Sequence, residues 1–129
     1  MEDVKAYDLE QRLIAFAVPI LELVRSMPKD IVGSHMAGQV VKCGTSTTLH
    51  YGEAQSAESM ADFIHKMKVC LKELRETRIC LLLIQRSNLV GSPKRLDALL
   101  EECIELIRIF KASVDTAEKN QVTPGRRKP

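Results

Sequence analysis

The sequence predicts an all-α fold, an up-down-up-down antiparallel four-helix bundle. Four segments carry apolar residues at alternating spacings of three and four, the period of a helix with one buried face, and no segment shows the alternation of a strand. Aromatic residues make up only 4% of the chain and tryptophan is absent, so the core must be aliphatic. A chain of 129 residues has room for one such core, and we expect a single domain over residues 1–118.

The first helix is expected at about 8–27. Asp8 begins a variant of the capping box, and an apolar seam follows at heptad-like spacing. Pro19 lies inside the seam and removes a backbone donor, which predicts a kink between Ala15 and Pro19. Because the seam keeps its phase across the proline, one kinked helix is favoured over two short ones.

The second helix is expected at about 30–55, with Asp30 as its N-cap. Its centre, residues 44–48, reads Gly-Thr-Ser-Thr-Thr and has poor intrinsic helix propensity. Val40, Cys43 and Thr47 nevertheless keep helical phase through this stretch. We therefore expect a continuous helix, whose small central residues let a neighbouring helix approach closely.

The third helix is expected at about 59–87, capped at Ser59, and the fourth at about 93–118, with a proline at its first position. Short connections between these segments make neighbouring helices antiparallel. Residues 119–129 show no periodicity and are expected to form a flexible basic tail.

Charge is segregated by helix, although the formal net charge is only +2. Residues 63–95 carry eight Lys or Arg against two Glu, whereas residues 96–118 carry two basic and six acidic residues. Four cations of the third helix fall within one arc at the edge of its apolar face, where they form a candidate nucleic-acid-binding stripe: Lys68, Lys72, Arg75 and Arg86. With Arg78, the candidate residues are Lys68, Lys72, Arg75, Arg78 and Arg86.

Two interpretations of this stripe remain open. Its cations either contact phosphates, or they pair with an acidic stripe formed by Asp97, Glu101 and Glu105 of the fourth helix, within or between subunits. The cations of the tail, which end the chain, offer further phosphate contacts or serve only solubility. Those tail cations are Arg126, Arg127 and Lys128.

Enzymatic chemistry has little support in the sequence. The three histidines show no metal-ligand spacing, and we expect no catalytic residue, no metal site and no cofactor. None of the four cysteines belongs to a C-x-x-C pair, which favours reduced thiols in a cytoplasmic protein. Cys43, Cys70 and Cys103 lie on apolar stripes, as structural cysteines do. No apolar run is long enough to span a membrane.

Several motifs are similar to one known family. The segments Lys42–Thr47 and Tyr51–Ala54, then Asp62-Phe63-Ile64, and finally Leu71-Lys72-Glu73 with Glu76-Thr77 follow one another in its order and spacing. The chain resembles the four-helix bundle family of 23S rRNA-intervening-sequence proteins over roughly residues 8–118. Cys43 departs from the pattern, since serine is usual at that position.

The resemblance implies a ring-shaped homopentamer of such bundles. A related branch resembles the accessory variability proteins of diversity-generating retroelements, in which a pentameric bundle binds nucleic acid and a reverse transcriptase. We therefore expect a non-enzymatic, oligomeric scaffold that binds RNA or DNA, with a reverse transcriptase as a further partner. The alternative is a structural assembly or protein-interaction module that binds no nucleic acid.

Overall fold

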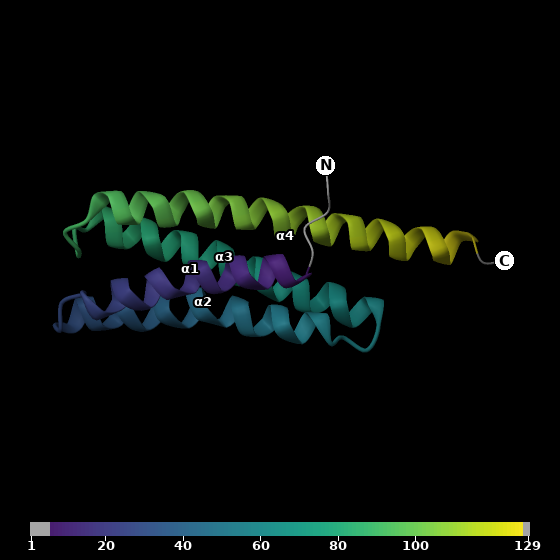
Figure 1. Cartoon of the computed structure of the whole chain (residues 1–129), viewed down its shortest axis with the longest axis horizontal. Coiled ribbons are helices and arrows are strands. Elements are labelled where there is room, and N and C mark those ends of the chain that lie inside the picture. The colour runs from purple at the N-terminus through teal and green to yellow at the C-terminus, as the bar shows by residue number, and fades with distance from the viewer. Residues whose placement is uncertain (1–5, 128–129) are drawn as a thin grey trace.

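The computed structural model describes the backbone of residues 6–127 and the side chains of residues 8–121, and it forms an all-α bundle (Figure 1). Over this range there are four helices and no strand. The helices are α1 (Ala6–Arg25), α2 (Ile31–Gln55), α3 (Met60–Arg86) and α4 (Pro93–Arg127). Consecutive helices run antiparallel because their connections are short, so the all-α, four-helix prediction is confirmed.

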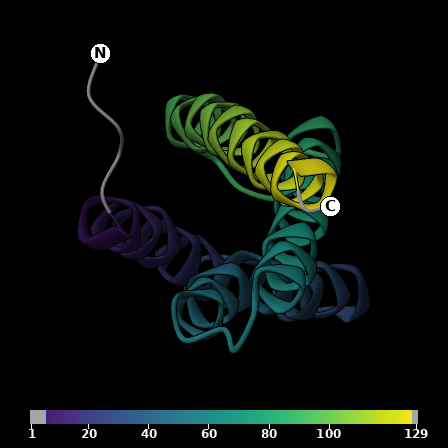
Figure 2. The same ribbon diagram turned by 90° about the vertical axis from the view of Figure 1, so that its right-hand side faces the viewer.

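Each helix packs mainly on its neighbour in sequence. Viewed end-on, α3 lies between α2 and α4, and α1 lies beside α2 (Figure 2). The smallest contact is that of α1 with α4. A bidentate ion pair spans it, because Arg12 donates to the two carboxylate oxygens of Glu102 at 2.6 and 2.9 Å. Hydrogen bonding to Glu102 raises the pKa of Arg12.

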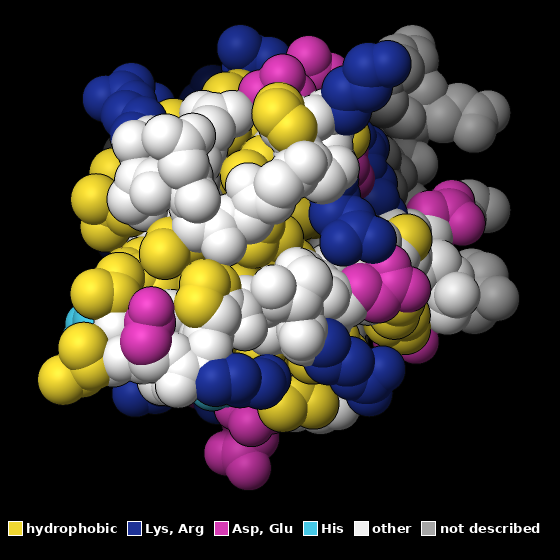
Figure 3. Space-filling view, turned by 90° about the vertical axis from the view of Figure 1, so that its left-hand side faces the viewer, with side chains coloured by type: hydrophobic (Ala, Val, Ile, Leu, Met, Phe, Trp, Pro, Cys, Tyr) yellow, Lys and Arg dark blue, Asp and Glu magenta, His cyan; other side chains and the backbone are white. Residues whose placement is uncertain are grey.

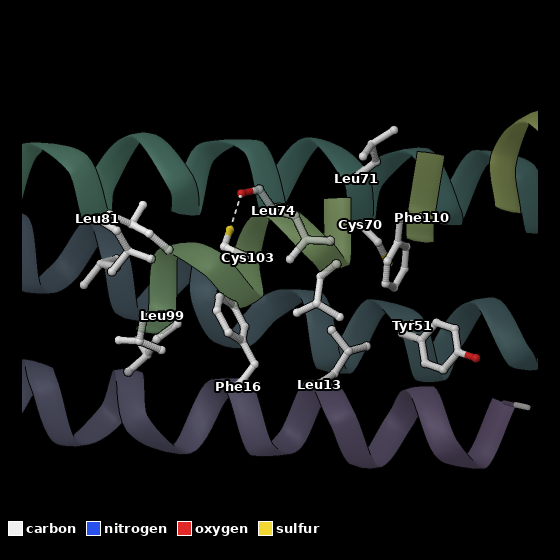
Figure 4. Packing of buried hydrophobic residues seen from close by; sticks show 14 of the residues in the cluster. Leu13, Phe16, Tyr51, Cys70, Leu71, Leu74, Leu81, Leu99, Cys103 and Phe110 are labelled. Atoms are coloured by element: carbon white, nitrogen blue, oxygen red, sulfur yellow. Dashed lines mark hydrogen bonds between the residues drawn. The ribbon is translucent and has the colours of Figure 1, made fainter. Parts of the chain in front are cut away.

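The core is mainly aliphatic, as the composition predicted, and all four helices contribute to it (Figure 4). Phe110 of α4 is fully buried, and its ring packs edge to face with that of Tyr51, with 5.7 Å between the centroids. Cys103 also packs in the core and donates to the backbone carbonyl of Leu74 at 3.2 Å. The fully buried side chains of largest volume include Leu13, Ile20, Leu23, Met67, Leu74, Leu81, Ile84, Leu96 and Leu106.

The predicted caps of α2 and α3 are both present. The Asp30 side chain accepts the amide hydrogen of Gly33 at 2.8 Å, and the Ser59 hydroxyl accepts that of Asp62 at 3.0 Å. Each cap satisfies a backbone donor that has no partner inside its helix. The two helices therefore begin where short polar side chains can replace the missing carbonyls.

The centre of α2 is helical despite its low propensity, as expected. The hydroxyls of Thr45, Ser46 and Thr47 each donate a hydrogen bond to the backbone carbonyl four residues earlier, so these side chains have partners within the helix. Gly44 brings α1 close, because a Cβ there would lie 2.7 Å from the Cδ1 atom of Ile20. Tertiary packing thus outweighs the intrinsic preference of this segment.

Helix α1 continues without interruption across Pro19. The carbonyl of Ala15 loses its helical donor there, but Ala15 is exposed, so water can bond to that carbonyl. The seam on either side of the proline is buried in one core, with Leu13, Phe16 and Ile20 all nearly inaccessible. A single helix, rather than two short ones, therefore forms over this stretch.

The C-terminal part of the chain differs from the expectation. Residues 119–127 continue α4 as helix instead of forming a flexible tail, and α4 extends past the other helices (Figure 1). Val114 and Ala117 are still buried, so the packed part of α4 ends just before this extension. Adding residues to an existing helix avoids the unfavourable nucleation step, and no apolar stripe is needed for it.

The turn that ends α3 is a Schellman motif. Asn88 adopts a left-handed backbone conformation with φ of 55°, the only positive φ at a non-glycine among the described residues. Its amide bonds the carbonyl of Gln85, and the amide of Leu89 bonds that of Ile84, both at 3.2 Å. The motif satisfies carbonyls at the end of the helix and directs the chain toward α4.

Substitutions at Asn88 test this turn. Asn88→Ala is expected to lower the free energy of unfolding by about 1 kcal/mol, because alanine tolerates a left-handed backbone poorly. Asn88→Gly is expected to leave it unchanged or raise it, because glycine adopts this conformation freely. Urea unfolding followed by circular dichroism measures both. Equal stability of the two variants would contradict a conformational requirement at this position.

Candidate nucleic-acid interface

Four of the five candidate cations border two grooves between α3 and α4. Lys68, Lys72 and Arg75 line the first, which has a volume of about 290 Å³. Lys111 lies across it on α4, and Asp115 and Glu118 complete its charged lining. The first groove therefore holds more cations than carboxylates.

The second groove, of about 410 Å³, continues along the same pair of helices. Arg75 and Arg78 border it from α3, and Arg108 borders it from α4. The rest of its lining is apolar and consists of Ile79, Ile104 and Ile107. Arg75 belongs to both grooves, so the cations form one continuous row. We call this row, from Lys68 to Arg78 on α3 with Arg108 and Lys111 on α4, the basic seam.

Arg86 lies outside the basic seam. It is in the last turn of α3 and borders neither groove, although it shares the exposed side of the helix. Two exposed apolar residues, Ile79 and Leu83, occupy the helix between Arg75 and Arg86. The structure therefore brings four of the five candidate cations together, Lys68, Lys72, Arg75 and Arg78, and leaves Arg86 apart.

The acidic stripe of α4 does not neutralise these cations within the chain. Asp97 accepts a hydrogen bond from Gln85 at 2.7 Å, and Glu105 pairs with Arg108 of its own helix at 3.2 Å. Glu101 makes no ion pair among the described residues. Over residues 8–121, no carboxylate of this stripe therefore lies within 4.0 Å of a candidate cation, and the structure does not form the intramolecular pairing.

Among residues 8–121, one of the five candidate cations has an acidic partner. Lys68 pairs with Glu118 at 2.7 Å, and both side chains are about half exposed. Over residues 8–121, Lys72, Arg75, Arg78 and Arg86 have no carboxylate within 4.0 Å. Exposed pairs such as Lys68–Glu118 contribute little stability. The positive surplus of the seam therefore rests on Lys72, Arg75 and Arg78.

The two sides of α3 differ in charge. The side toward α4 carries the basic seam, whereas the groove toward α2 includes Glu73 and Glu76. A carboxylate oxygen of Glu73 accepts a hydrogen bond from Nδ1 of His50 at 2.8 Å, and this bond links α3 to α2. The α3 cations of the basic seam thus lie on the α4 side of the helix, and a polyanion would meet them from that side.

Sequence reasoning missed Arg108 and Lys111, which face the α3 cations from the second helix of the seam. Both are paired within α4, Lys111 with Asp115 at 2.7 Å and Arg108 with Glu105. The sequence does not show that Arg108 and Lys111 share a groove with the α3 cations, because the register of α4 against α3 depends on the turn that joins the two helices. Pairing the two helical patterns in antiparallel register would place these residues opposite one another.

Metal binding and membrane spanning have no support in the described part of the chain. Over the described residues, no three His, Cys, Asp or Glu side chains are arranged as metal ligands, and no helix combines the length and apolarity needed to cross a bilayer. Burial raises the pKa of Cys70 and of Cys103 to about 12, which leaves both thiols protonated near neutrality. Cys43, Cys70 and Cys103 are buried, as their positions on apolar stripes predicted.

The fold and the seam together define a class of protein: a four-helix bundle with a row of cations on one side. Three of these cations, Lys72, Arg75 and Arg78, have no carboxylate within 4.0 Å over residues 8–121. The family model for 23S rRNA-intervening sequence proteins matches residues 5–112, and the chain belongs to this family. The recognition made from the sequence motifs is thereby confirmed.

A solved structure supports the same assignment. The chain is similar to a protein with unknown function from the S23 ribosomal protein family of Bacteroides thetaiotaomicron, with 28% identity and a TM-score of 0.74. The similarity covers 81% of this chain and 96% of that one. No protein of curated function matches the chain significantly.

Proposed function

We propose that this protein is a non-enzymatic, homo-oligomeric scaffold that binds RNA or DNA through phosphate contacts. The observation that carries the proposal is that, over residues 8–121, no carboxylate lies within 4.0 Å of Lys72, Arg75 or Arg78. Unpaired cations in a row can each neutralise a phosphate and release its counterion. Such contacts bind the backbone and carry no sequence preference.

The scaffold would act in the cytoplasm as a homopentameric ring, the assembly that the family resemblance implies. A ring would repeat the basic seam on each subunit and turn a modest monomer charge into an extended positive surface. Its further partner would be a reverse transcriptase, which the nucleic acid and the scaffold would contact together. The resemblance to accessory variability proteins supports this part of the proposal.

An exposed apolar stripe on α1 supports assembly. Ile14, Val18 and Leu21 follow one another at helical spacing, and each is 40–46% exposed. Hydrophobic side chains are also prominent at the end of the bundle that carries the α1–α2 and α3–α4 connections, with Lys and Arg around them (Figure 3). Apolar surface of this kind favours the alternative function as well, that of an assembly module without nucleic-acid binding.

Reversal of two seam charges tests the proposal. Lys72→Glu with Arg75→Glu is expected to weaken binding of a labelled structured RNA at least about 10-fold, because two phosphate contacts become repulsive. Fluorescence anisotropy over a range of salt concentrations measures the affinity. The slope of log affinity against log salt should also fall by about 2, one unit for each lost contact.

Arg25→Glu with Lys29→Glu is the matched control. Both residues are exposed, unpaired within the described part, and lie at the α1–α2 turn, outside the seam. This variant has the same net charge as the seam variant, so it should bind nearly as well as the wild type. Equal weakening by both variants would contradict a localised interface.

The oligomeric state of both variants, from analytical ultracentrifugation, separates the two functions. A seam variant that assembles normally but no longer binds supports the nucleic-acid interface. A seam variant that falls apart indicates that the cations lie between subunits, which favours the assembly module. Wild-type protein that binds no RNA even at low salt would overturn the nucleic-acid proposal.

A further inference from the structure

Two of the four cysteines meet across the α2–α3 interface. The Sγ atoms of Cys43, on α2, and Cys80, on α3, lie 4.0 Å apart, and both thiols are free. This separation is that of two sulfur atoms in van der Waals contact. The two helices make the most extensive contact in the bundle, so the pair is held on closely packed backbones.

The pair borders solvent. Cys43 and Cys80 line an open groove of about 370 Å³ between α2 and α3, distinct from the basic seam. Cys43 is nearly buried, whereas Cys80 is partly exposed. A small polar molecule in the groove therefore reaches Cys80 first, with Cys43 directly behind it.

The other two thiols lack both properties. Cys70 and Cys103 are completely buried, and their Sγ atoms donate to the carbonyls of Thr47 and Leu74, respectively. Neither lines the groove. The four thiols thus divide into one accessible pair and two enclosed single residues.

We propose that Cys43 and Cys80 are a modification site, at which a peroxide forms a reversible intramolecular disulfide between α2 and α3. A disulfide requires the sulfur atoms to approach from 4.0 Å to about 2.05 Å. Rotation about the two Cα–Cβ bonds, together with a shift of the helices that carry them, would supply this movement. The site is independent of nucleic-acid binding, since the basic seam faces α4.

The reaction has two steps. The Cys80 thiolate attacks one oxygen of hydrogen peroxide, the O–O bond breaks, and the departing hydroxide takes a proton to become water, leaving a sulfenic acid. The Cys43 sulfur then attacks the Cys80 sulfur. An S–S bond forms, the S–O bond breaks, and the hydroxide takes the Cys43 proton as a second water. Two thiols have lost two electrons, which the peroxide has accepted.

The surroundings of the pair make this reaction slow at neutral pH. Burial raises the pKa of Cys80 to about 12, with further contributions from Cys43 and from Glu76. Glu73 and Glu76 of α3 and Lys42 of α2 are the charged groups of the groove. Because only the thiolate attacks, the rate should rise about 10-fold for each pH unit between pH 7 and pH 9. The pair therefore responds to sustained oxidation, not to brief exposure.

The disulfide would cross-link α2 and α3, which are already packed together. It closes a loop between residues 37 positions apart, which restricts the unfolded chain. The midpoint of thermal unfolding should rise by about 10 °C in the oxidised protein. Reduction with dithiothreitol should restore the original midpoint.

Peptide mapping of the oxidised full-length protein tests the proposal. Trypsin places the four cysteines on separate peptides, with Cys43 in 43–66, Cys80 in 79–86, Cys70 in 69–72 and Cys103 in 96–108. The protein is treated with hydrogen peroxide at pH 8, blocked with a maleimide, and digested without reductant. The expected product joins 43–66 to 79–86, at a mass two hydrogens below the sum of the peptides, and disappears after dithiothreitol.

Substitutions of single cysteines provide the controls. Cys43→Ser and Cys80→Ser should each abolish the linked peptide, and Cys43→Ser should leave a Cys80 sulfenic acid that dimedone traps. Cys70→Ala should leave the link intact, with circular dichroism confirming that each variant folds. Absence of the link in the wild-type protein, or links to Cys70, to Cys103 or between subunits in comparable amounts, would overturn the proposal.

Discussion

Gly33→Ala is expected to lower the free energy of unfolding by about 3 kcal/mol. A Cβ atom at Gly33 would lie 2.0 Å from the carbonyl oxygen of Pro28 and 2.8 Å from its carbonyl carbon. Both atoms belong to the backbone of the α1–α2 turn and cannot rotate away as a side chain can. The turn must therefore open, and the Asp30 cap, whose carboxylate bonds the Gly33 amide, opens with it.

Gly38→Ala is the matched control in the same helix. A Cβ at Gly38 meets nothing within 4 Å, so only the helix propensity changes. Alanine is the better helix former, and the free energy of unfolding should rise by about 1 kcal/mol. Urea unfolding at one fixed protein concentration measures both variants, because any assembly makes stability depend on concentration. Similar effects of the two substitutions would contradict a steric role for Gly33.

Phe110→Ala is expected to lower the free energy of unfolding by about 3–5 kcal/mol. The side chain is 0% exposed, so its removal leaves a cavity that packed helices fill only in part. The substitution also removes the edge-to-face contact with Tyr51, whose ring plane is inclined by 74° to that of Phe110. Contacts of this geometry contribute about 1 kcal/mol beyond the buried area.

Tyr51→Phe distinguishes the contribution of the Tyr51 ring to stability from that of its hydroxyl. It keeps the aromatic contact with Phe110 and should therefore affect stability far less than Phe110→Ala does. Urea unfolding monitored by circular dichroism gives both values. A loss below about 1 kcal/mol for Phe110→Ala would show that α4 repacks freely, against the dense core that the burial of Phe110 indicates.

The helices could be predicted because their signals are local. Asp30 and Ser59 cap helices at the positions that the sequence indicated, and the seam of α1 crosses Pro19 in phase. The extension of α4 could not be predicted from periodicity. An apolar stripe indicates that one face of a helix is buried, so a helical segment that extends beyond the bundle, as α4 does after Ala117, has no such stripe.

The candidate site could be predicted only in part, because it depends on register between helices. The helical wheel groups Lys68, Lys72 and Arg75 with Arg86, and the first three do line the grooves, whereas Arg86 does not. The partners across the grooves, Arg108 and Lys111, come from α4, and their position depends on the geometry of the Asn88 turn. The contact of Cys43 with Cys80 was hidden for the same reason. The side chains of the tail cations Arg126, Arg127 and Lys128 lie outside the described residues.

The pattern of contacts between helices has a consequence for folding kinetics. Most contacts join helices that are adjacent in sequence, so the mean sequence separation of contacting residues is low. Chains of this topology fold within microseconds to milliseconds, because few long loops must close before contacts form. The pairing of Arg12 with Glu102 joins residues 90 positions apart and is the principal exception. We therefore expect α2, α3 and α4 to associate early, with the closure of α1 onto α4 completing the native state.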